Sequence, residues 1–213
     1  MYVPSSFAVT DVSRLHGWIE EFSFATLVSG GGGLEASHLP LLLERDGGPR
    51  GTLLGHFARA SDHWRQAAGQ PVLAIFHGPH VYISPRWYDN PNLVPTWNYV
   101  AVHAYGRLEL IEDVDATLAL LRRMTSHYEA AFAPPWQLGA DELSLRKLAE
   151  QVVAFCIPID RLEGKAKLSQ NHPPARRQRV IAGLREQGSA AGIQIAGLME
   201  LATEPESSKH RQG

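Results

Sequence analysis

The segments with strand character in this chain are gathered in one block, and segments with helical character flank that block. Between residues 24 and 111, short runs of apolar, β-branched and aromatic residues are separated by turns rich in glycine and proline. Only one later run, residues 156–162, has strand character. A sheet of parallel strands would instead alternate strands with helices along the chain. The order therefore predicts an α+β protein built on an antiparallel sheet or barrel.

The local patterns give approximate bounds for each element. Apolar runs and two-residue alternation predict strands at residues 24–29, 34–44, 51–59, 72–76, 81–84, 99–111 and 156–162. Helical spacing and capping residues predict helices at residues 11–22, 60–68, 113–132, 141–155, 174–187 and 190–201. We expect one domain with flanking helices over residues 1–172, a C-terminal helical segment packed on it over residues 173–202, and a disordered polar tail over residues 203–213.

Composition excludes several classes of protein. The chain has 213 residues, with 20 Lys+Arg against 22 Asp+Glu, which argues against a polycation that coats nucleic acid or membrane. Its single cysteine, Cys156, can form neither an internal disulfide nor a thiolate zinc site, which fits the cytoplasm. No run approaches the roughly 18 apolar residues of a membrane span, and residues 1–11 do not resemble a secretory signal. We therefore expect a soluble cytoplasmic protein with no membrane partner.

Ten histidines raise the question of a metal or haem site. His77 and His80 are three residues apart, and His56 and His103 lie on neighbouring expected strands. Catalytic metal sites usually add carboxylates or a helical histidine pair, and the sequence shows neither near these residues. Hydrogen bonding in turns and at strand ends is the favoured interpretation. The sequence also lacks a Gly-x-Ser-x-Gly nucleophile motif, so we predict no metal ligands and no catalytic residues.

Aromatic and polar residues are concentrated on either side of residue 90. Ser84, Trp87 and Tyr88 directly follow an apolar strand, and Thr96, Trp97 and Asn98 precede the next one. Aromatic faces beside hydroxyl and amide groups suit a planar heterocycle that needs both stacking and hydrogen bonds at its edge. The alternative is that these aromatic residues fill the core or a dimer interface. A homodimer is expected, since one small barrel would not readily bury this many aromatic side chains.

Two lysines stand close together near the end of the expected sheet. Lys165 and Lys167 share one side of a strand or turn, and Ser169 and Gln170 follow within three residues. Such a group suits a phosphate or another anion, although a solvated lysine pair is the alternative. Further along, residues 176–185 carry four arginines that could contact DNA phosphates or simply form a solvated helix face.

Eight segments in order resemble the PaiB family of FMN-binding negative transcriptional regulators. They are residues 1–4, 24–28, 38–43, 55–60, 78–88, 94–99, 102–106 and 164–171. The resemblance implies an antiparallel split β-barrel of the FMN-binding type flanked by helices, in a homodimer with flavin between the subunits. It also implies a bacterial repressor of genes for degradative enzymes and sporulation. This chain departs from the family pattern at Ala166, where an aromatic residue is common.

Chemistry and resemblance together give a set of candidate FMN-binding residues. They are His38, His56, Arg59, Ser84, Trp87, Tyr88, Thr96, Trp97, Asn98, Lys165, Lys167, Ser169 and Gln170. We expect Arg59, Lys165 and Lys167 to serve the phosphate, and Trp97 and Asn98 to serve the flavin ring. The first interpretation is an FMN-binding transcriptional regulator that also contacts DNA. The alternatives are an FMN-dependent oxidoreductase of the split-barrel class and, third, a haem-binding split barrel.

Overall fold

The computed structural model describes residues 1–90, 92–139 and 141–202. The chain divides into two compact units. Unit 1 comprises residues 1–10, 77–101 and 163–213, and unit 2 comprises residues 11–76 and 102–162. The expected tail, residues 203–213, lies outside the described residues.

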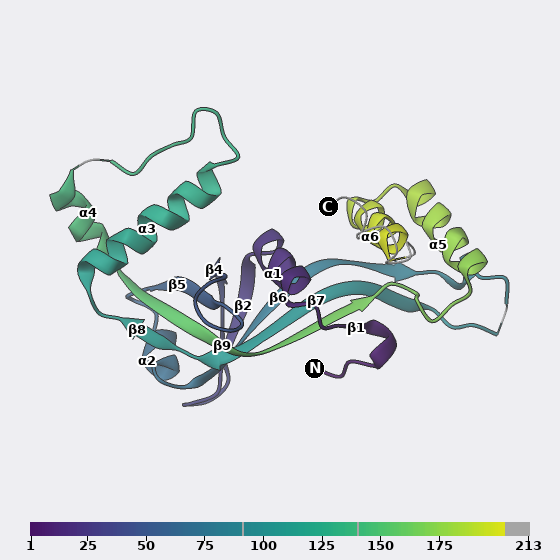
Figure 1. The fold of residues 1–213 in the computed structure, drawn as a ribbon, viewed down its shortest axis with the longest axis horizontal. Coiled ribbons are helices and arrows are strands. Elements are labelled where there is room, and N and C mark those ends of the chain that lie inside the picture. Colours follow the sequence, from purple (N-terminus) through teal and green to yellow (C-terminus); the bar gives the residue numbers. More distant parts are fainter. Residues whose placement is uncertain (91, 140, 203–213) are drawn as a thin grey trace, which may run out of the picture. The chain divides into compact units, whose positions relative to one another are not determined.

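The strands form a nine-stranded sheet with the order β3-β2-β6-β7-β9-β5-β4, and β1 and β8 pair with β9 (Figure 1). Three long strands have residues in both units: β6 (Pro71–Ile83), β7 (Thr96–Arg107) and β9 (Val152–Lys167). The strands within unit 2 are β2 (Phe24–Ser29), β3 (Glu35–Pro40), β4 (Leu42–Glu44), β5 (Thr52–Ala58) and β8 (Glu109–Ile111). The pairs β2–β3, β2–β6, β4–β5 and β5–β9 are antiparallel. The predicted α+β class with an antiparallel sheet is therefore confirmed.

The helices of unit 2 begin where the sequence places capping residues. The helices are α1 (Val12–Glu21), α2 (His63–Ala67), α3 (Val114–Glu129) and α4 (Glu142–Ala149). The Asp11 carboxylate accepts a hydrogen bond from the backbone N–H of Ser13 at 2.9 Å, which confirms the expected start of α1. Asp113 caps α3 in the same way.

The core of unit 2 lies between α1 and the strands around β5. Phe57 of β5 and Phe155 of β9 are fully buried, with ring centroids 4.8 Å apart. Residue 55, which lies beside these rings, is glycine because a Cβ there would fall 2.7 Å from Leu41 and 2.8 Å from Phe155. The sheet of unit 2 therefore packs around large rings that leave no space for a side chain at residue 55.

Unit 1 consists of strand ends covered by helices. Its elements are η1 (Ser5–Phe7), β1 (Ala8–Val9), η2 (Pro85–Trp87), α5 (Pro174–Gln187), α6 (Ala190–Leu201) and parts of the three long strands. Gly188 adopts φ 72°, the left-handed conformation that ends α5 and allows the chain to turn into α6. Figure 1 shows α5 and α6 on one side of the strands of unit 1 and the N-terminal segment on the other.

Several of the expected element bounds are wrong. The strands expected over residues 34–44 and 99–111 are each divided in two, into β3 and β4 and into β7 and β8. The helix expected over residues 141–155 ends at Ala149, and β9 begins at Val152. The run after residue 151 is apolar and pairs with β5, so strand pairing decides where helical spacing alone was ambiguous. Similarly, the strands expected at 72–76 and 81–84 are one continuous strand, β6, because the chain keeps its extended course through Gly78 and Pro79.

Candidate functional site

The buried side chain of Asn98 shows which face of the strands in unit 1 is turned toward α6. The side chain of Asn98 on β7 donates to the Ser169 hydroxyl at 3.0 Å and contacts the sulfur of Met199 on α6 at 3.5 Å. Because alternate residues of a strand point to opposite faces, Trp97 and Tyr99 lie on the face away from α6. That second face carries the aromatic side chains.

Four aromatic residues share the face away from the helices. His80 and Tyr82 on β6 approach the ring of Trp97 on β7, with centroid distances of 6.3 and 6.0 Å. Tyr82 is 44% exposed and Trp97 is 53% exposed. We call His80, Tyr82, Trp97 and Tyr99 the aromatic face. Exposed rings in edge and tilted contact can accept a further planar ring by stacking.

Lys165 on β9 lies beside the aromatic face, and its ammonium group has interaction partners there. Its ammonium donates to the backbone carbonyl of Tyr2 at 3.0 Å and lies 5.2 Å from the ring centroid of Tyr99 and 5.7 Å from that of Tyr2. Only 8% of Lys165 is exposed. The N-terminal segment therefore satisfies this cation through a carbonyl and two aromatic faces.

Lys167 lies two residues further along β9 and is only partly enclosed. Its ammonium donates to the Thr96 hydroxyl and, at 3.1 Å, to the backbone carbonyl of Trp97. Burial, and secondly the nearby charge of Lys165, lower the pKa of Lys167. Among the described residues no carboxylate pairs with Lys167. This ammonium next to the aromatic face therefore gains from an added anion.

The turn after Lys167 is held by its own side chains. Gln170 donates to the carbonyl of Ala166 at 2.6 Å and accepts from the N–H of Leu168 at 2.7 Å. Ser169 has φ 62°, the left-handed region that a non-glycine residue rarely adopts, and its buried hydroxyl bonds the Asn98 amide. Such a conformation costs of order 1 kcal/mol and is found preferentially at functional sites. The strained turn fixes the position of Lys167.

Further positive charge gathers where this turn enters α5. A nitrogen of the Arg176 guanidinium lies 3.2 Å from His172 Nδ1, and the ring of Tyr88 lies 5.4 Å from that of His172. Burial, followed by the charges of Arg176 and Lys167, lowers the pKa of His172. The Asp89 carboxylate bonds both Arg176, at 2.9 Å, and the next arginine of the helix face, Arg179, at 2.7 Å. A single carboxylate thus stands among three basic side chains.

Trp87 and Tyr88 contact α5, and Ser84 caps the η2 segment that carries Trp87. The Ser84 hydroxyl accepts from the N–H of Arg86 at 3.4 Å and caps η2. Trp87 lies against Gly183 of α5, where a Cβ would fall 2.5 Å from Trp87 Cδ1. These three candidates lie in the same unit as Lys167. Trp87 and Tyr88 contact α5, the Ser84 hydroxyl bonds within η2, and Tyr88 also interacts electrostatically with Tyr82 of the aromatic face.

The other three candidates belong to unit 2, and each has separate neighbours. His38 is exposed on β3, 3.1 Å from the Thr26 hydroxyl and stacked on Phe24 at 6.3 Å. His56 on β5 has a buried Nδ1 without a hydrogen-bond partner, and burial lowers its pKa. Arg59 donates to the carbonyls of Glu150 at 2.5 Å and Val152 at 2.8 Å, closing the end of α4.

Sequence reasoning missed four residues of the site in unit 1. The sequence places Tyr82 in a separate strand over residues 81–84, considers His80 only as a metal ligand, and does not connect His172 or Arg176 with Lys167. The alternation of His80 and Tyr82 on one continuous strand was the available signal. The arginines predicted as a basic helix surface are mostly engaged: Arg185 pairs with Glu200, and Arg177 is buried and donates to the Met199 carbonyl.

Two kinds of feature, a metal-binding group and a membrane-spanning helix, are absent from the described residues. No three histidine, cysteine, aspartate or glutamate side chains in this part of the chain come together as a metal-binding group. Likewise, none of the described helices combines the length and the apolar character that crossing a membrane requires.

An antiparallel sheet with this strand order and flanking helices places the chain in the class of split β-barrel folds. The sequence matches the family described as "Putative FMN-binding domain" over residues 1–161, and the chain belongs to that family. Its cofactor is accordingly FMN. The resemblance and fold expected from the sequence are thereby confirmed.

Two relatives extend the similarity over most of the chain. The Bacillus subtilis "Protease synthase and sporulation protein PAI 2" is 36% identical over 207 residues, covering 94% of this chain and 97% of that protein. The Emericella nidulans protein AN0679 is 30% identical, covering 78% of this chain and 81% of that protein. The first relative agrees with the PaiB resemblance.

Solved structures share the fold at low sequence identity. The FAD and heme binding protein from Mycobacterium smegmatis aligns with a TM-score of 0.58 and 18% identity, covering 75% of this chain and 73% of that one. The flavocytochrome Anf3 from Azotobacter vinelandii aligns with a TM-score of 0.57 and 16% identity, covering 75% and 69%. At such identities the likeness concerns the fold.

Proposed function

We propose that this chain is an FMN-binding transcriptional regulator that holds the cofactor on the aromatic face, with the phosphate at Lys167. The observation that carries the assignment is the Lys167 ammonium, which bonds the backbone carbonyl of the exposed Trp97 and pairs with none of the described carboxylates. FMN combines a planar ring with a phosphate dianion, so it matches both features of this site.

The residues around Lys167 suit the two parts of FMN differently. Arg176 adds positive charge beside this turn, whereas the lowered pKa of His172 means that its ring takes part as a neutral hydrogen-bonding group. Trp97 and Tyr82 offer exposed rings for stacking of the isoalloxazine. When bound, FMN supplies one- and two-electron redox chemistry, whereas the protein supplies orientation and charge. Ser169, Asn98 and Gln170 act by holding the turn that bears Lys167.

The regulatory part of the proposal draws on the Bacillus subtilis relative, whose name refers to protease synthesis and sporulation. We extend it to a homodimeric cytoplasmic repressor that contacts DNA, supported by the family resemblance and by the single cysteine. Light scattering should give the mass of a dimer at micromolar concentration. In gel-shift assays with DNA from upstream of the protein's own gene, the affinity should fall as the salt concentration is raised. A monomer, or no shift at low salt, would contradict this part.

The phosphate assignment is tested by titrating FMN and riboflavin against Lys167→Met. A charge-assisted hydrogen bond contributes about 1.5–3 kcal/mol, so FMN should bind about tenfold to a hundredfold more weakly. Riboflavin, which lacks the phosphate, should bind as it does to the unmodified protein. Lys147→Met is the matched control, because Lys147 is exposed on α4 in the other unit.

The two flavins separate the possible roles of Lys167. Equal losses for riboflavin and FMN would mean that Lys167 shapes the ring site rather than binding phosphate. Unchanged FMN affinity would remove Lys167, and with it the aromatic face, from the cofactor site.

A further inference from the structure

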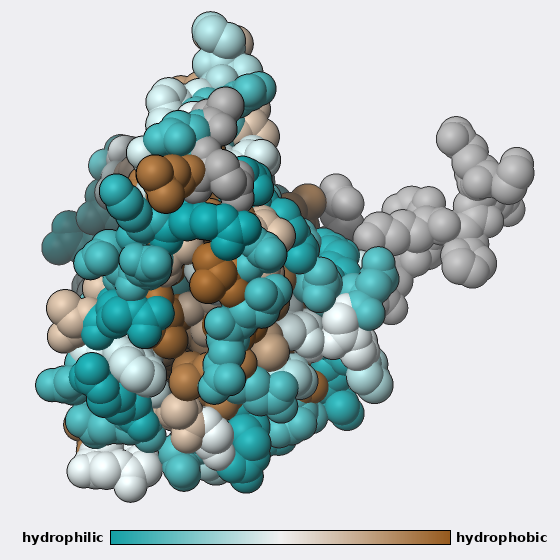
Figure 2. All heavy atoms as spheres, turned by 90° about the vertical axis from the view of Figure 1, so that its left-hand side faces the viewer, coloured by the Kyte–Doolittle hydropathy of each residue, from teal (hydrophilic) through white to brown (hydrophobic). Residues whose placement is uncertain are grey.

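Unit 2 contains a hollow of about 340 Å³ between two helices and the segment that connects them. It is lined by Leu121, Thr125, Trp136, Leu138, Gly139, Asp141, Ser144, Leu145 and Leu148. The walls are therefore α3, residues 136–139 and α4. Figure 2 views this end of unit 2 and shows hydrophobic side chains gathered among hydrophilic ones.

The floor of the hollow is made of packed leucines. Leu145 is 4% exposed and packs in a cluster with Leu118 and Ala149, and Leu121 and Leu138 pack against that cluster. An apolar floor held by α3 and α4 together gives a preformed surface rather than a gap between loose side chains. A ligand there would remove apolar surface from water without first opening the protein.

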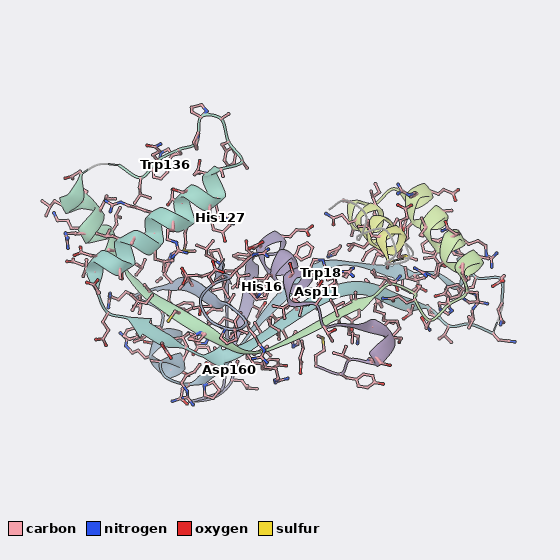
Figure 3. All side chains as sticks on the ribbon, viewed as in Figure 1. Asp11, His16, Trp18, His127, Trp136 and Asp160 are labelled. Carbon is pink, nitrogen blue, oxygen red and sulfur yellow. The ribbon has the colours of Figure 1, made fainter. Side chains whose placement is uncertain are left out.

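Trp136 forms one wall and remains largely open to solvent. Its ring is 60% exposed, and its backbone N–H donates to the Glu129 carboxylate of α3 at 3.0 Å. Figure 3 shows Trp136 on the connecting segment above α3, in unit 2. The tether to Glu129 holds the indole beside the hollow, where a ring compound can stack on it.

The charge of the lining restricts the chemistry of the occupant. Of the described residues that line the hollow, none is a cation. The one charged group is Asp141, whose carboxylate accepts from the N–H of Ser144 at 3.3 Å and caps α4, and these bonds to Ser144 lower its pKa. An anion would therefore meet a carboxylate and no counter-charge. FMN, with its phosphate dianion, does not fit this hollow.

We propose that the hollow between α3 and α4 is a second ligand site, which binds a small, uncharged, apolar ring compound. Its volume lies in the range of small-molecule pockets, and its apolar walls with a few polar groups at the rim are typical of such pockets. The exposed side chains of α3 include Arg122, Arg123 and His127, so charged groups lie on the same helix as part of the apolar wall. A concave apolar site bordered by charge suits a small molecule rather than a broad protein surface.

A matched pair of fluorescent probes tests both the place and the charge preference. N-phenyl-1-naphthylamine is uncharged, and 1-anilinonaphthalene-8-sulfonate carries the same rings with a sulfonate. The uncharged probe should bind with one saturable site and receive energy from Trp136, and the sulfonated probe should bind at least tenfold more weakly. Excess FMN should leave the uncharged probe bound, because the two sites are separate.

Two exposed leucines of α4 provide the variant and its control. Leu148, 59% exposed, lines the hollow, whereas Leu143, 66% exposed, does not. Because a carboxylate on the apolar wall would be desolvated by the ligand, Leu148→Glu should weaken the uncharged probe by at least about tenfold. Leu143→Glu should leave its affinity unchanged, and Trp136→Phe should abolish most of the energy transfer.

Three outcomes would overturn the proposal. They are the same affinity loss in both glutamate variants, tighter binding of the sulfonated probe, and displacement of the uncharged probe by FMN. Circular dichroism of the two leucine variants checks that both remain folded, which the exposure of these side chains leads us to expect.

Discussion

Replacing Gly183 with alanine tests how Trp87 is seated on α5. Alanine in a helix interior is normally more favourable than glycine by about 0.8–1 kcal/mol. At residue 183, however, the new Cβ would lie 2.5 Å from Trp87 Cδ1 and closer still to Nε1 and Cε2. Something must therefore shift, and overpacking of this kind costs about 1–3 kcal/mol. We expect Gly183→Ala to lower the free energy of unfolding by about 1 kcal/mol.

Gly197 of α6 is the matched control for this substitution. It is also a helical glycine of unit 1, but a Cβ there would meet nothing within 4 Å. Gly197→Ala should therefore raise the free energy of unfolding by about 0.8–1 kcal/mol. Urea unfolding of the two variants should show midpoints that move in opposite directions.

A double-mutant cycle identifies Trp87 as the cause. In a Trp87→Leu background the indole is absent, so Gly183→Ala should become stabilising, with a coupling energy of about 1–3 kcal/mol. If Gly183→Ala stabilises the unmodified protein as much as Gly197→Ala does, the Trp87 ring does not pack against residue 183. The role of Trp87 as the attachment of η2 to α5 would then be refuted.

Two further predictions concern unit 2. The ring of His63 is buried between the hydroxyls of Ser29 at 3.0 Å and Ser37 at 2.7 Å, and burial lowers its pKa below the ordinary 6.5. As the pH falls, His63 is therefore protonated in the unfolded chain before it is protonated in the folded protein. The contribution of neutral His63 to stability is complete above pH 6.5 and declines as the pH falls toward the folded pKa. His63→Gln should reduce the loss of unfolding free energy between about pH 7.5 and 5.5; an unchanged slope would contradict the assignment. Arg59→Ala should lower the unfolding free energy by about 1–3 kcal/mol because two backbone carbonyls lose their donor, and an unchanged urea midpoint would leave the guanidinium available for phosphate, as the sequence suggested.

The sequence predicted the fold well where the local signal and the tertiary structure agree. Asp11 begins α1, residues 24–29 form β2 as expected, and Gly188 separates α5 from α6. The failure at residues 150–155 has a physical cause, because a short apolar run satisfies helical spacing and strand pairing equally well. Pairing with β5, which lies about a hundred residues earlier in the chain, and with β8 decides the matter.

The candidate site was predicted in its residue types rather than in its arrangement. Lys167 and Trp97 were chosen for charge and ring, and the carbonyl of Trp97 does bind the Lys167 ammonium. The sequence could not show that Lys165, two residues earlier, is enclosed by Tyr2, because that contact joins opposite ends of the chain. Roles that depend on such distant neighbours are visible only in the folded protein.

The left-handed backbone at Ser169 has a consequence for any attempt to stabilise this protein. Glycine adopts φ 62° without steric cost, so the backbone alone would favour glycine at this position. The same change would remove the hydroxyl that bonds Asn98 and would loosen the turn that carries Lys167. Because a buried amide left without a partner costs about 1–3 kcal/mol, the lost hydroxyl offsets the relief of the backbone, and serine suits this turn although its φ is unfavourable.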